Sequence, residues 1–308
     1  MAKTVYLFSG QGSQNRGMGL DFVENENVRK IFEIGSAIMG WDIIAAIREK
    51  TKEELGNTLI SQPAIFAVSL AAHEMATQSG LKAHGVAGHS LGEYAAMVSS
   101  GMLSLEDGFK AIKLRCEAMN RAAQENPGSM AAVLGADVSL IEEVCAEITA
   151  SGDYVSPVNY NSRAQTVIAG THDGISKASD SLKAKGVRKI IKLAVSAAFH
   201  SKLMESAAKQ VQEGLKDFTF NVPDKEFFSN VSGSKLTDFS AMPKYLGTHI
   251  CSPVKFHDEL LAMKDAGYDT FIELGSDKIL TGLVKKTLPD VTAFNIENNE
   301  TLIRSGGE

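Results

Sequence analysis

The sequence predicts an α/β fold in two parts, and three observations lead to this prediction. Short apolar, strand-like runs alternate with helical runs from the N-terminus onward, as they do in α/β domains. A serine flanked by glycines, Gly88-His89-Ser90-Leu91-Gly92, lies between an apolar run and a helical one. After Asn126-Pro127-Gly128 the rhythm of strands and helices changes. We therefore expect a large α/β domain, residues 1–125 and 198–308, into which a small domain, residues 126–197, is inserted.

The first elements of the large domain are indicated by an apolar run and by helix-start residues. Residues 5–8 form a strand-like run that leads into Gly10-Gln11-Gly12-Ser13-Gln14. A helix is predicted over 63–78, because Pro63 suits the first turn of a helix. A second helix is predicted to begin behind Ser104-Leu105-Glu106-Asp107, which is a capping pattern, and to run to about residue 124.

The small domain has its own order of elements. The pattern predicts strands over 130–134, 155–160, 165–170 and 188–193, and helices over 139–149 and 173–185. Ser139 with Glu142 is expected to cap the first of these helices. The resulting β-α-β-β-α-β order is that of a ferredoxin-like unit.

Composition and charge exclude several classes of protein. No apolar run approaches the roughly 20 residues that span a bilayer, and the N-terminus lacks the longer apolar core of a signal peptide. The three cysteines, Cys116, Cys145 and Cys251, form no C-x-x-C pair, which favours free thiols in a cytoplasmic setting over zinc or disulfides. The net charge of −6 argues against nucleic-acid binding. We expect no membrane, nucleic-acid or metal partner.

The glycine-flanked serine is typical of a nucleophile elbow. In a turn this tight, the residues two before and two after the serine must be small, and here both are glycine. The serine hydroxyl then stands at the mouth of the sheet, above the N-terminus of the next helix, which we expect to end at Gly101. We therefore expect Ser90 to be a catalytic nucleophile and the large domain to be α/β-hydrolase-like.

A serine nucleophile needs a base, and histidine is the usual one. Of the seven histidines, His200 lies where the chain returns from the small domain to the large one, and junctions between domains form clefts. A half-buried packing role for His200 is the alternative. The oxyanion of the intermediate would accept hydrogen bonds from the amide of Leu91 and from a second amide in the Gly10–Gln14 loop. This loop does not complete a phosphate-binding motif.

Together these segments resemble the malonyl-CoA:acyl carrier protein transacylases of fatty acid synthesis and the related acyltransferase domains of polyketide synthases. The resemblance runs from Phe8 to about Leu283. Its motifs stand as Gly10-Gln11-Gly12-Ser13-Gln14, Ser61-Gln62-Pro63-Ala64, Gly88-His89-Ser90-Leu91-Gly92-Glu93, Arg115, Asn159-Tyr160-Asn161-Ser162, Phe199-His200-Ser201 and Ser252-Pro253-Val254.

The resemblance implies a role for each of these site residues. Ser90 would be the nucleophile, His200 the general base, and the amides of Gln11 and Leu91 the oxyanion hole. Arg115 would bind the free carboxylate of the malonyl group, because a guanidinium offers carboxylate a planar pair of donors. Phe199, directly before the catalytic histidine, and the aliphatic Leu91 both resemble the malonyl-selective pattern rather than the methylmalonyl one.

The chain departs from the family pattern at two places. His249 stands where the family usually has glutamine, and the backbone carbonyl at that position is the group that orients the catalytic histidine in the family. A second imidazole there could alter the response to pH. The late glycine-proline-glycine segment of the family appears here as Gly275-Ser276-Asp277, which puts the local loop geometry in question.

The expected reaction is a ping-pong transfer through a malonyl-Ser90 ester, with malonyl-CoA and acyl carrier protein as partners. We expect no cofactor or metal, and we expect the protein to be a monomer. Because carrier proteins are acidic, we expect docking on the basic residues of the small domain, Lys183, Lys185, Arg188, Lys189 and Lys192.

Three alternatives remain open at this stage. A serine esterase or thioesterase would order its triad with histidine last, so that His249 or His257 would be the base and water the acceptor. A trans-acting acyltransferase would serve a polyketide carrier protein instead of a fatty acid one. An inactive relative would only bind a carrier.

Overall fold

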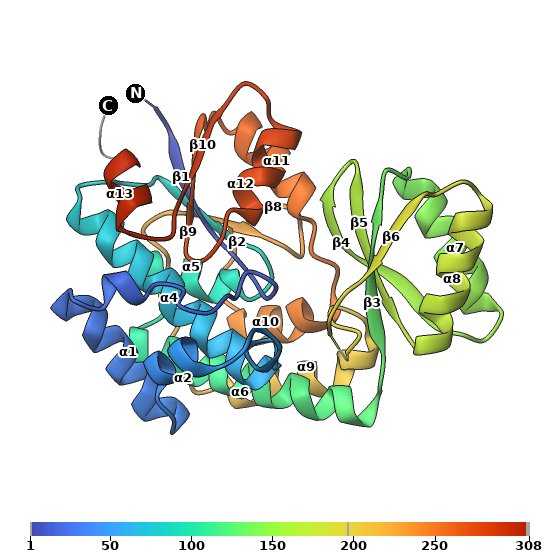
Figure 1. Cartoon of the computed structure of the whole chain (residues 1–308), viewed down its shortest axis with the longest axis horizontal. Helices are drawn as coiled ribbons and strands as arrows, with labels where there is room; N and C mark the ends of the chain where they lie inside the picture. The colour runs from blue at the N-terminus through green and yellow to red at the C-terminus, as the bar shows by residue number, and fades with distance from the viewer. Residues whose placement is uncertain (1, 196, 306–308) are drawn as a thin grey trace.

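The computed structural model describes residues 2–195 and 197–305, and its strands form two separate sheets (Figure 1). The larger sheet contains β1 (Thr4–Phe8), β2 (Gly85–Gly88), β7 (Glu226–Ser229), β8 (Ser234–Lys235), β9 (Thr270–Leu274) and β10 (Thr292–Ile296). The smaller sheet contains β3 (Ser129–Leu134), β4 (Val155–Ser162), β5 (Gln165–Gly170) and β6 (Lys189–Lys192).

The two sheets differ in strand direction. The larger sheet has the order β10-β9-β1-β2-β7-β8, and all its pairs are parallel except β7 with β8. The smaller sheet has the order β4-β5-β3-β6, and all its pairs are antiparallel. The chain is therefore a mixed α/β protein with a parallel sheet and a separate antiparallel sheet.

Helices cover both faces of the larger sheet and one face of the smaller sheet. They are α1 (Glu26–Met39), α2 (Ile43–Glu49), α3 (Lys52–Leu55), α4 (Thr58–Gln78), α5 (Gly92–Ser99), α6 (Leu105–Glu125), α7 (Val138–Ala150), α8 (His172–Ala184), α9 (Glu205–Gly214), α10 (Met242–Cys251), α11 (Phe256–Asp265), α12 (Ile279–Thr287) and α13 (Asn299–Ser305). Two short 3-10 helices, Leu20–Phe22 and Lys202–Met204, complete the described elements.

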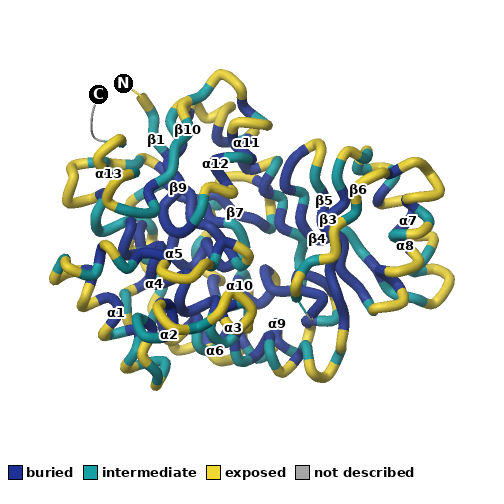
Figure 2. The backbone as a smooth tube through the Cα atoms, viewed as in Figure 1, coloured by how far each residue is buried: buried dark blue, intermediate teal, exposed yellow. Residues whose placement is uncertain are grey.

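The core of the larger part follows from the alternation of side chains along β1. Tyr6 and Phe8 pack in the apolar cluster that includes residues of α1, α4 and α6, whereas Val5 and Leu7 pack in the cluster with α11 and α12. Because both faces are buried, β1 is a continuous apolar run, as expected for a central parallel strand. Figure 2 shows the larger sheet around β1 and β9 mostly in the dark blue of buried residues.

In the smaller part, α7 and α8 pack on one face of the antiparallel sheet, away from the larger sheet (Figure 1). Alternate residues of β3 serve the two faces: Ala131 and Val133 pack in the cluster under these helices, and Met130 and Ala132 face the other way. One segment of the larger part also reaches β4, because Tyr160 donates its amide to the Val254 carbonyl at 2.8 Å. This contact ties the segment between α10 and α11 to the smaller sheet.

The strand predictions agree with the structure to within two residues at each end, but two helix starts are wrong. The helix predicted from Pro63 begins at Thr58, with Asn57 as its N-cap, so that Pro63 lies inside the helix. Burial of nearly all sides of α4 outweighs the hydrogen bond that proline removes. The predicted Ser139 cap is also wrong, because α7 begins at Val138 after Asp137. No helix in the described part of the chain has the length and apolar character needed to cross a membrane.

Candidate active site

The elbow around Ser90 joins the end of β2 to the start of α5. Ser90 has a φ of 54°, a left-handed backbone conformation that non-glycine residues rarely adopt. A Cβ on Gly88 would lie 2.0 Å from the backbone carbon of Gly92, and a Cβ on Gly92 would lie 1.9 Å from the Phe8 carbonyl oxygen. Both glycines are therefore required by the close approach of backbone, as the motif predicts.

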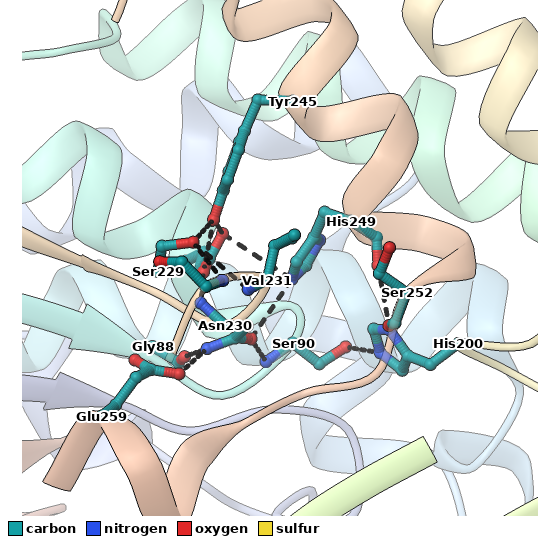
Figure 3. Close-up of polar contacts among 12 residues, drawn as sticks. Gly88, Ser90, His200, Ser229, Asn230, Val231, Tyr245, His249, Ser252 and Glu259 are labelled. Carbon is teal, nitrogen blue, oxygen red and sulfur yellow. Dashed lines mark hydrogen bonds and ion pairs between the residues drawn. The ribbon is translucent and has the colours of Figure 1, made fainter. Parts of the chain in front are cut away.

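His200 lies directly against the serine. Its Nε2 is 2.6 Å from Ser90 Oγ, and its Nδ1 is 3.1 Å from the carbonyl oxygens of His249 and Ser252 (Figure 3). Because carbonyl oxygens only accept hydrogen bonds, Nδ1 carries the proton and Nε2 is the free lone pair that faces the hydroxyl. Backbone carbonyls thus occupy the position that a carboxylate holds in a serine–histidine–acid triad.

The environment of His200 keeps its imidazole neutral. Burial, followed by the positive charge of Arg115 and by His89, lowers the pKa of His200 to about 3. The ring is therefore unprotonated at neutral pH and available as a base.

Arg115 reaches the same hydroxyl from α6. Its guanidinium donates to Ser90 Oγ at 3.0 Å and to the side-chain oxygen of Gln62, and the residue is only 1% exposed. Its Nε has no hydrogen-bond acceptor, and no carboxylate of the described chain forms an ion pair with it. Burial lowers the pKa of Arg115, yet guanidinium keeps its charge in proteins. A buried cation with unused donors is suited to bind an anionic group that arrives from outside.

Two backbone amides near Ser90 have no partner in the described chain. Among the described residues, neither the Gln11 nor the Leu91 amide has an acceptor. The loop that carries Gln11 approaches the elbow closely, since a Cβ on Gly10 would lie 2.4 Å from the His89 carbonyl oxygen. Free amides on neighbouring loops are the arrangement that an oxyanion hole needs.

A cavity of about 410 Å³ lies over Ser90, between the two sheets. Its reactive wall, which belongs to the larger part of the chain, contains Ser90, Arg115 and His200. Its apolar wall, which belongs to the smaller sheet, contains Met130, Ala132 and Val167.

Two further features of this cavity bear on its chemistry. Phe199 also lines it, beside the base. His89 Nε2 lies 2.8 Å from Asn161 Oδ1 of β4, so a polar contact links the two walls.

A buried polar network, which the sequence analysis did not identify, lies beneath the elbow (Figure 3). Asn230, directly after β7, accepts a hydrogen bond from the Ser90 amide at 2.7 Å and donates to Gly88 and Glu259 at 2.6 Å each. Its own amide donates to Glu93. No local pattern in the sequence marks this role, because the partners of Asn230 come from distant segments.

The residues at which the sequence departs from the family pattern, and the alternative base His257, lie around the site but do not contact Ser90 by hydrogen bonds. His249 is fully buried on α10 and its ring contacts Asn230, whereas His257 lies on α11; neither forms a hydrogen bond to Ser90. In the Gly275-Ser276-Asp277 segment, the Ser276 hydroxyl donates to the Ser13 carbonyl at 2.7 Å. The departure at this segment is therefore compatible with a firm contact to the Gln11 loop.

The basic residues of the small domain differ in their pairing. Lys183 pairs with Asp180, and Lys185 with Glu143 and Glu147. Arg188, Lys189 and Lys192 are exposed and form no ion pair within the described chain. In the same part of the chain, no group of three or more His, Cys, Asp or Glu residues is placed to hold a metal ion.

Comparison with known proteins gives a consistent family. The family model described as "Acyl transferase domain" matches residues 5–302. The malonyl CoA-acyl carrier protein transacylase of Bacillus subtilis (strain 168) is 36% identical over 303 residues, which cover 98% of this chain and 96% of that protein.

Solved structures agree with this match. The crystal structure of malonyl-CoA:acyl carrier protein transacylase from Xanthomonas oryzae pv. oryzae has a TM-score of 0.94 at 34% identity, covering 99% of this chain and 98% of that one. A malonyl-transacylase solved in complex with its type II polyketide synthase acyl-carrier protein has a TM-score of 0.94 at 32% identity, covering 99% of each chain.

Proposed function

We propose that this chain, which belongs to the acyl transferase domain family, moves a malonyl group from malonyl-CoA to the phosphopantetheine thiol of an acyl carrier protein. The observation that carries the proposal is the buried Arg115, which has no carboxylate partner and lies 3.0 Å from the nucleophilic oxygen of Ser90. A serine acyltransferase needs no such cation, but one that selects an acyl group with a free carboxylate does.

In the first half-reaction, His200 Nε2 takes the hydroxyl proton as Ser90 Oγ attacks the thioester carbonyl carbon. The amides of Gln11 and Leu91 hold the oxygen anion of the tetrahedral intermediate. The intermediate collapses, the carbon–sulfur bond breaks, and His200 returns the proton to the sulfur of coenzyme A. A malonyl-Ser90 ester remains, with its carboxylate on Arg115.

In the second half-reaction, the carrier's thiol gives its proton to His200 and attacks the ester carbonyl. The same amides hold the second oxyanion, and Ser90 leaves with the proton from His200. Because coenzyme A departs before the carrier reacts, the kinetics are ping-pong. No metal or prosthetic group takes part in this scheme.

Selection of the acyl group follows from the cavity. Arg115 favours an acyl group that ends in a carboxylate, and Phe199 lines the cavity beside His200, where a bulky ring leaves little room for an α-methyl branch. Both features support malonyl over acetyl and methylmalonyl.

The fold supports a division into two domains with the boundaries given by the sequence, residues 126–197 within residues 1–125 and 198–308. The β-α-β-β-α-β connectivity and the strand order β4-β5-β3-β6 favour a ferredoxin-like small domain. The parallel sheet with a strand–serine elbow–helix unit favours an α/β-hydrolase-like large domain. The base nevertheless precedes His249 and His257 and lacks an acid, which counts against an ordinary esterase.

The carrier protein is proposed to dock beside β6. Arg188, Lys189 and Lys192 offer unpaired positive charge there, next to Leu193 at the cavity lining, whereas Lys183 and Lys185 are already paired. A monomeric state and a cytoplasmic location stay predictions of the sequence.

Intact-protein mass spectrometry tests the proposed reaction. The protein is mixed with malonyl-CoA, and a holo acyl carrier protein of fatty acid or polyketide type is then added, with Ser90→Ala as control. A malonyl adduct that requires Ser90 and moves to a carrier supports the proposal, and the preferred carrier identifies the pathway. Release of free malonate without transfer would indicate a hydrolase, and absence of any adduct would indicate a binding protein.

A further inference from the structure

We propose that Asn230 is a positioning residue for the transfer reaction, because its side chain joins the nucleophile elbow to α10, whose His249 carbonyl accepts a hydrogen bond from the base His200. The kinetic test of this inference rests on the proposed function, whereas the contacts of Asn230 from which it is argued do not. Asn230 is fully buried and does not line the cavity, so it acts through other residues.

The side chain of Asn230 uses all of its hydrogen-bonding capacity. Its Oδ1 accepts from the Ser90 amide at 2.7 Å and from His249 Nε2 at 3.2 Å. Its Nδ2 donates to the Gly88 carbonyl at 2.6 Å and to a Glu259 carboxyl oxygen at 2.6 Å. An amide has two acceptor sites and two donor protons, and each has a partner here.

The bonds to Gly88 and Ser90 fix the elbow from beneath. Gly88 precedes the turn and Ser90 has a positive φ, so the backbone between them is held in a conformation that local preferences alone disfavour. One amide that accepts from Ser90 and donates to Gly88 holds both sides of this turn. A strained turn persists only where its surroundings determine it in this way.

The hydrogen bond from His249 to Asn230 connects Asn230 indirectly to the base His200. The backbone carbonyl of His249 accepts a hydrogen bond from His200 Nδ1 at 3.1 Å, and the ring of His249 donates from Nε2 to Asn230 Oδ1. The path Ser90 amide–Asn230–His249–His200 therefore connects the nucleophile to the residue that deprotonates it. Figure 3 shows Asn230 linked to Ser90 and to the ring of His249, with Ser90 lying between Asn230 and His200.

The surrounding carboxyl groups make the amide hard to replace. The Asn230 backbone amide donates to Glu93 at 2.6 Å, and Glu259 lies on the other side. Both glutamates are fully buried, and burial raises the pKa of each. An aspartate at position 230 would lose both donor protons and would add a third carboxyl group to this buried cluster.

The test is the isosteric variant Asn230→Asp, which changes the hydrogen bonding without changing the volume. We expect kcat for malonyl transfer to fall about 100-fold, the order expected when reacting groups are displaced by a fraction of an ångström to an ångström. KM for malonyl-CoA should change by less than about threefold, because Asn230 does not contact the substrate. A fall in kcat of less than about threefold would overturn the proposal.

A destabilised control separates positioning from general stability. Val144→Ala removes two methyl groups from the core under the smaller sheet, far from Ser90, and should lower the melting temperature while leaving kcat unchanged. Glu259→Gln keeps the acceptor for Asn230 Nδ2, and Glu259→Leu removes it. Greater activity in the glutamine variant than in the leucine variant supports the network, and equal activity contradicts it.

A substrate-independent readout separates this inference from the proposed function. Labelling of Ser90 by a fluorophosphonate probe depends on the Ser90–His200 pair and not on the natural acyl group, with Ser90→Ala as the blank. Slower labelling in Asn230→Asp than in the wild type supports positioning even if malonyl transfer is absent. An unchanged labelling rate overturns it even if malonyl transfer is present.

Discussion

The two walls of the cavity differ in how they use buried polar groups. The reactive wall belongs to a part of the chain in which Glu93, Arg115, His200, His249 and Glu259 are all buried. The buried polar residues of the described stretch around the smaller sheet are serine, threonine and asparagine, without a buried Asp, Glu, His, Lys or Arg. In the described chain, the buried acidic, histidine and arginine side chains thus belong to the part that carries the reactive wall, whereas the other part supplies apolar lining and exposed basic residues.

The largest effect should follow from removing the reacting pair on the reactive wall. Ser90→Ala or His200→Ala should lower kcat by on the order of 10⁶, by analogy with serine hydrolases. Because the two residues act as one unit, the double variant should be no slower than about the slower single variant. Steady-state transfer assays check this, and losses that multiply in the double variant would contradict a shared step.

The next effect concerns acyl selection by Arg115. Arg115→Ala should reduce the preference for malonyl-CoA over acetyl-CoA by about tenfold or more, since a hydrogen bond to a charged group contributes roughly 1.5–3 kcal/mol. Arg115→Lys should not restore it, because an ammonium cannot hold Gln62 and a carboxylate in one plane.

Competition between the two thioesters measures the selectivity of the Arg115 variants. Arg121→Ala, on the same helix but bonded only to Gln210 at the surface, is the matched control. Unchanged selectivity in Arg115→Ala would refute the role of this arginine.

A smaller effect should come from the exposed charges of the small domain. Reversing Lys189 and Lys192 to glutamate should raise KM for the carrier several-fold, since exposed ion pairs contribute about 0.2–1 kcal/mol each. Formation of the malonyl enzyme from malonyl-CoA should be unaffected, because the first half-reaction does not involve the carrier.

The control for this pair of substitutions carries the same change in net charge on the larger part of the chain. Reversal of Lys209 and Lys264, both exposed on α9 and α11, serves that purpose. Transfer to the carrier should also slow as salt is added. Equal losses in both double variants, or rates insensitive to salt, would place the docking surface elsewhere.

The sequence predicts the features that depend on neighbouring residues and misses those that depend on contacts between distant segments. The two glycines of the elbow, the Ser104 cap and the strands of the smaller sheet depend on neighbouring residues, and the structure confirms them. The helix start predicted at Pro63 is wrong, because tertiary packing of α4 overrides the local preference of proline for a first turn. Asn230 could not be found, because its role depends on β2, α10 and α11 meeting beneath Ser90.

Arg115 shows the limit most clearly. Its position in a helical pattern is compatible with a surface residue, and only the resemblance to a family indicated a role. The structure buries it to 1% exposure, because α6 packs against α4 and brings Gln62 to its guanidinium. Burial of a charge is a property of the whole fold, and no local pattern encodes it.

The smallest expected effect concerns stability and should come from Glu93. Burial raises its pKa from an ordinary 4.5 to about 8, so between these values the folded protein binds more protons than the unfolded chain. Stability therefore falls as the pH rises through this window. Glu93→Gln keeps an acceptor for the Asn230 amide and for Tyr245, but it cannot ionise.

The melting temperature of Glu93→Gln relative to the wild type should therefore rise between pH 5 and pH 8, by a few degrees at the scale of about 2–4 °C per kcal/mol. Glu147→Gln, an exposed carboxylate on α7, removes the same charge from the other region and is the control. If the melting temperatures of Glu93→Gln and the wild type change with pH in parallel across this range, ionisation of Glu93 does not destabilise the folded protein. A melting-temperature difference from the wild type that grows with pH in Glu93→Gln, but not in Glu147→Gln, would assign this cost to the buried network beneath Ser90.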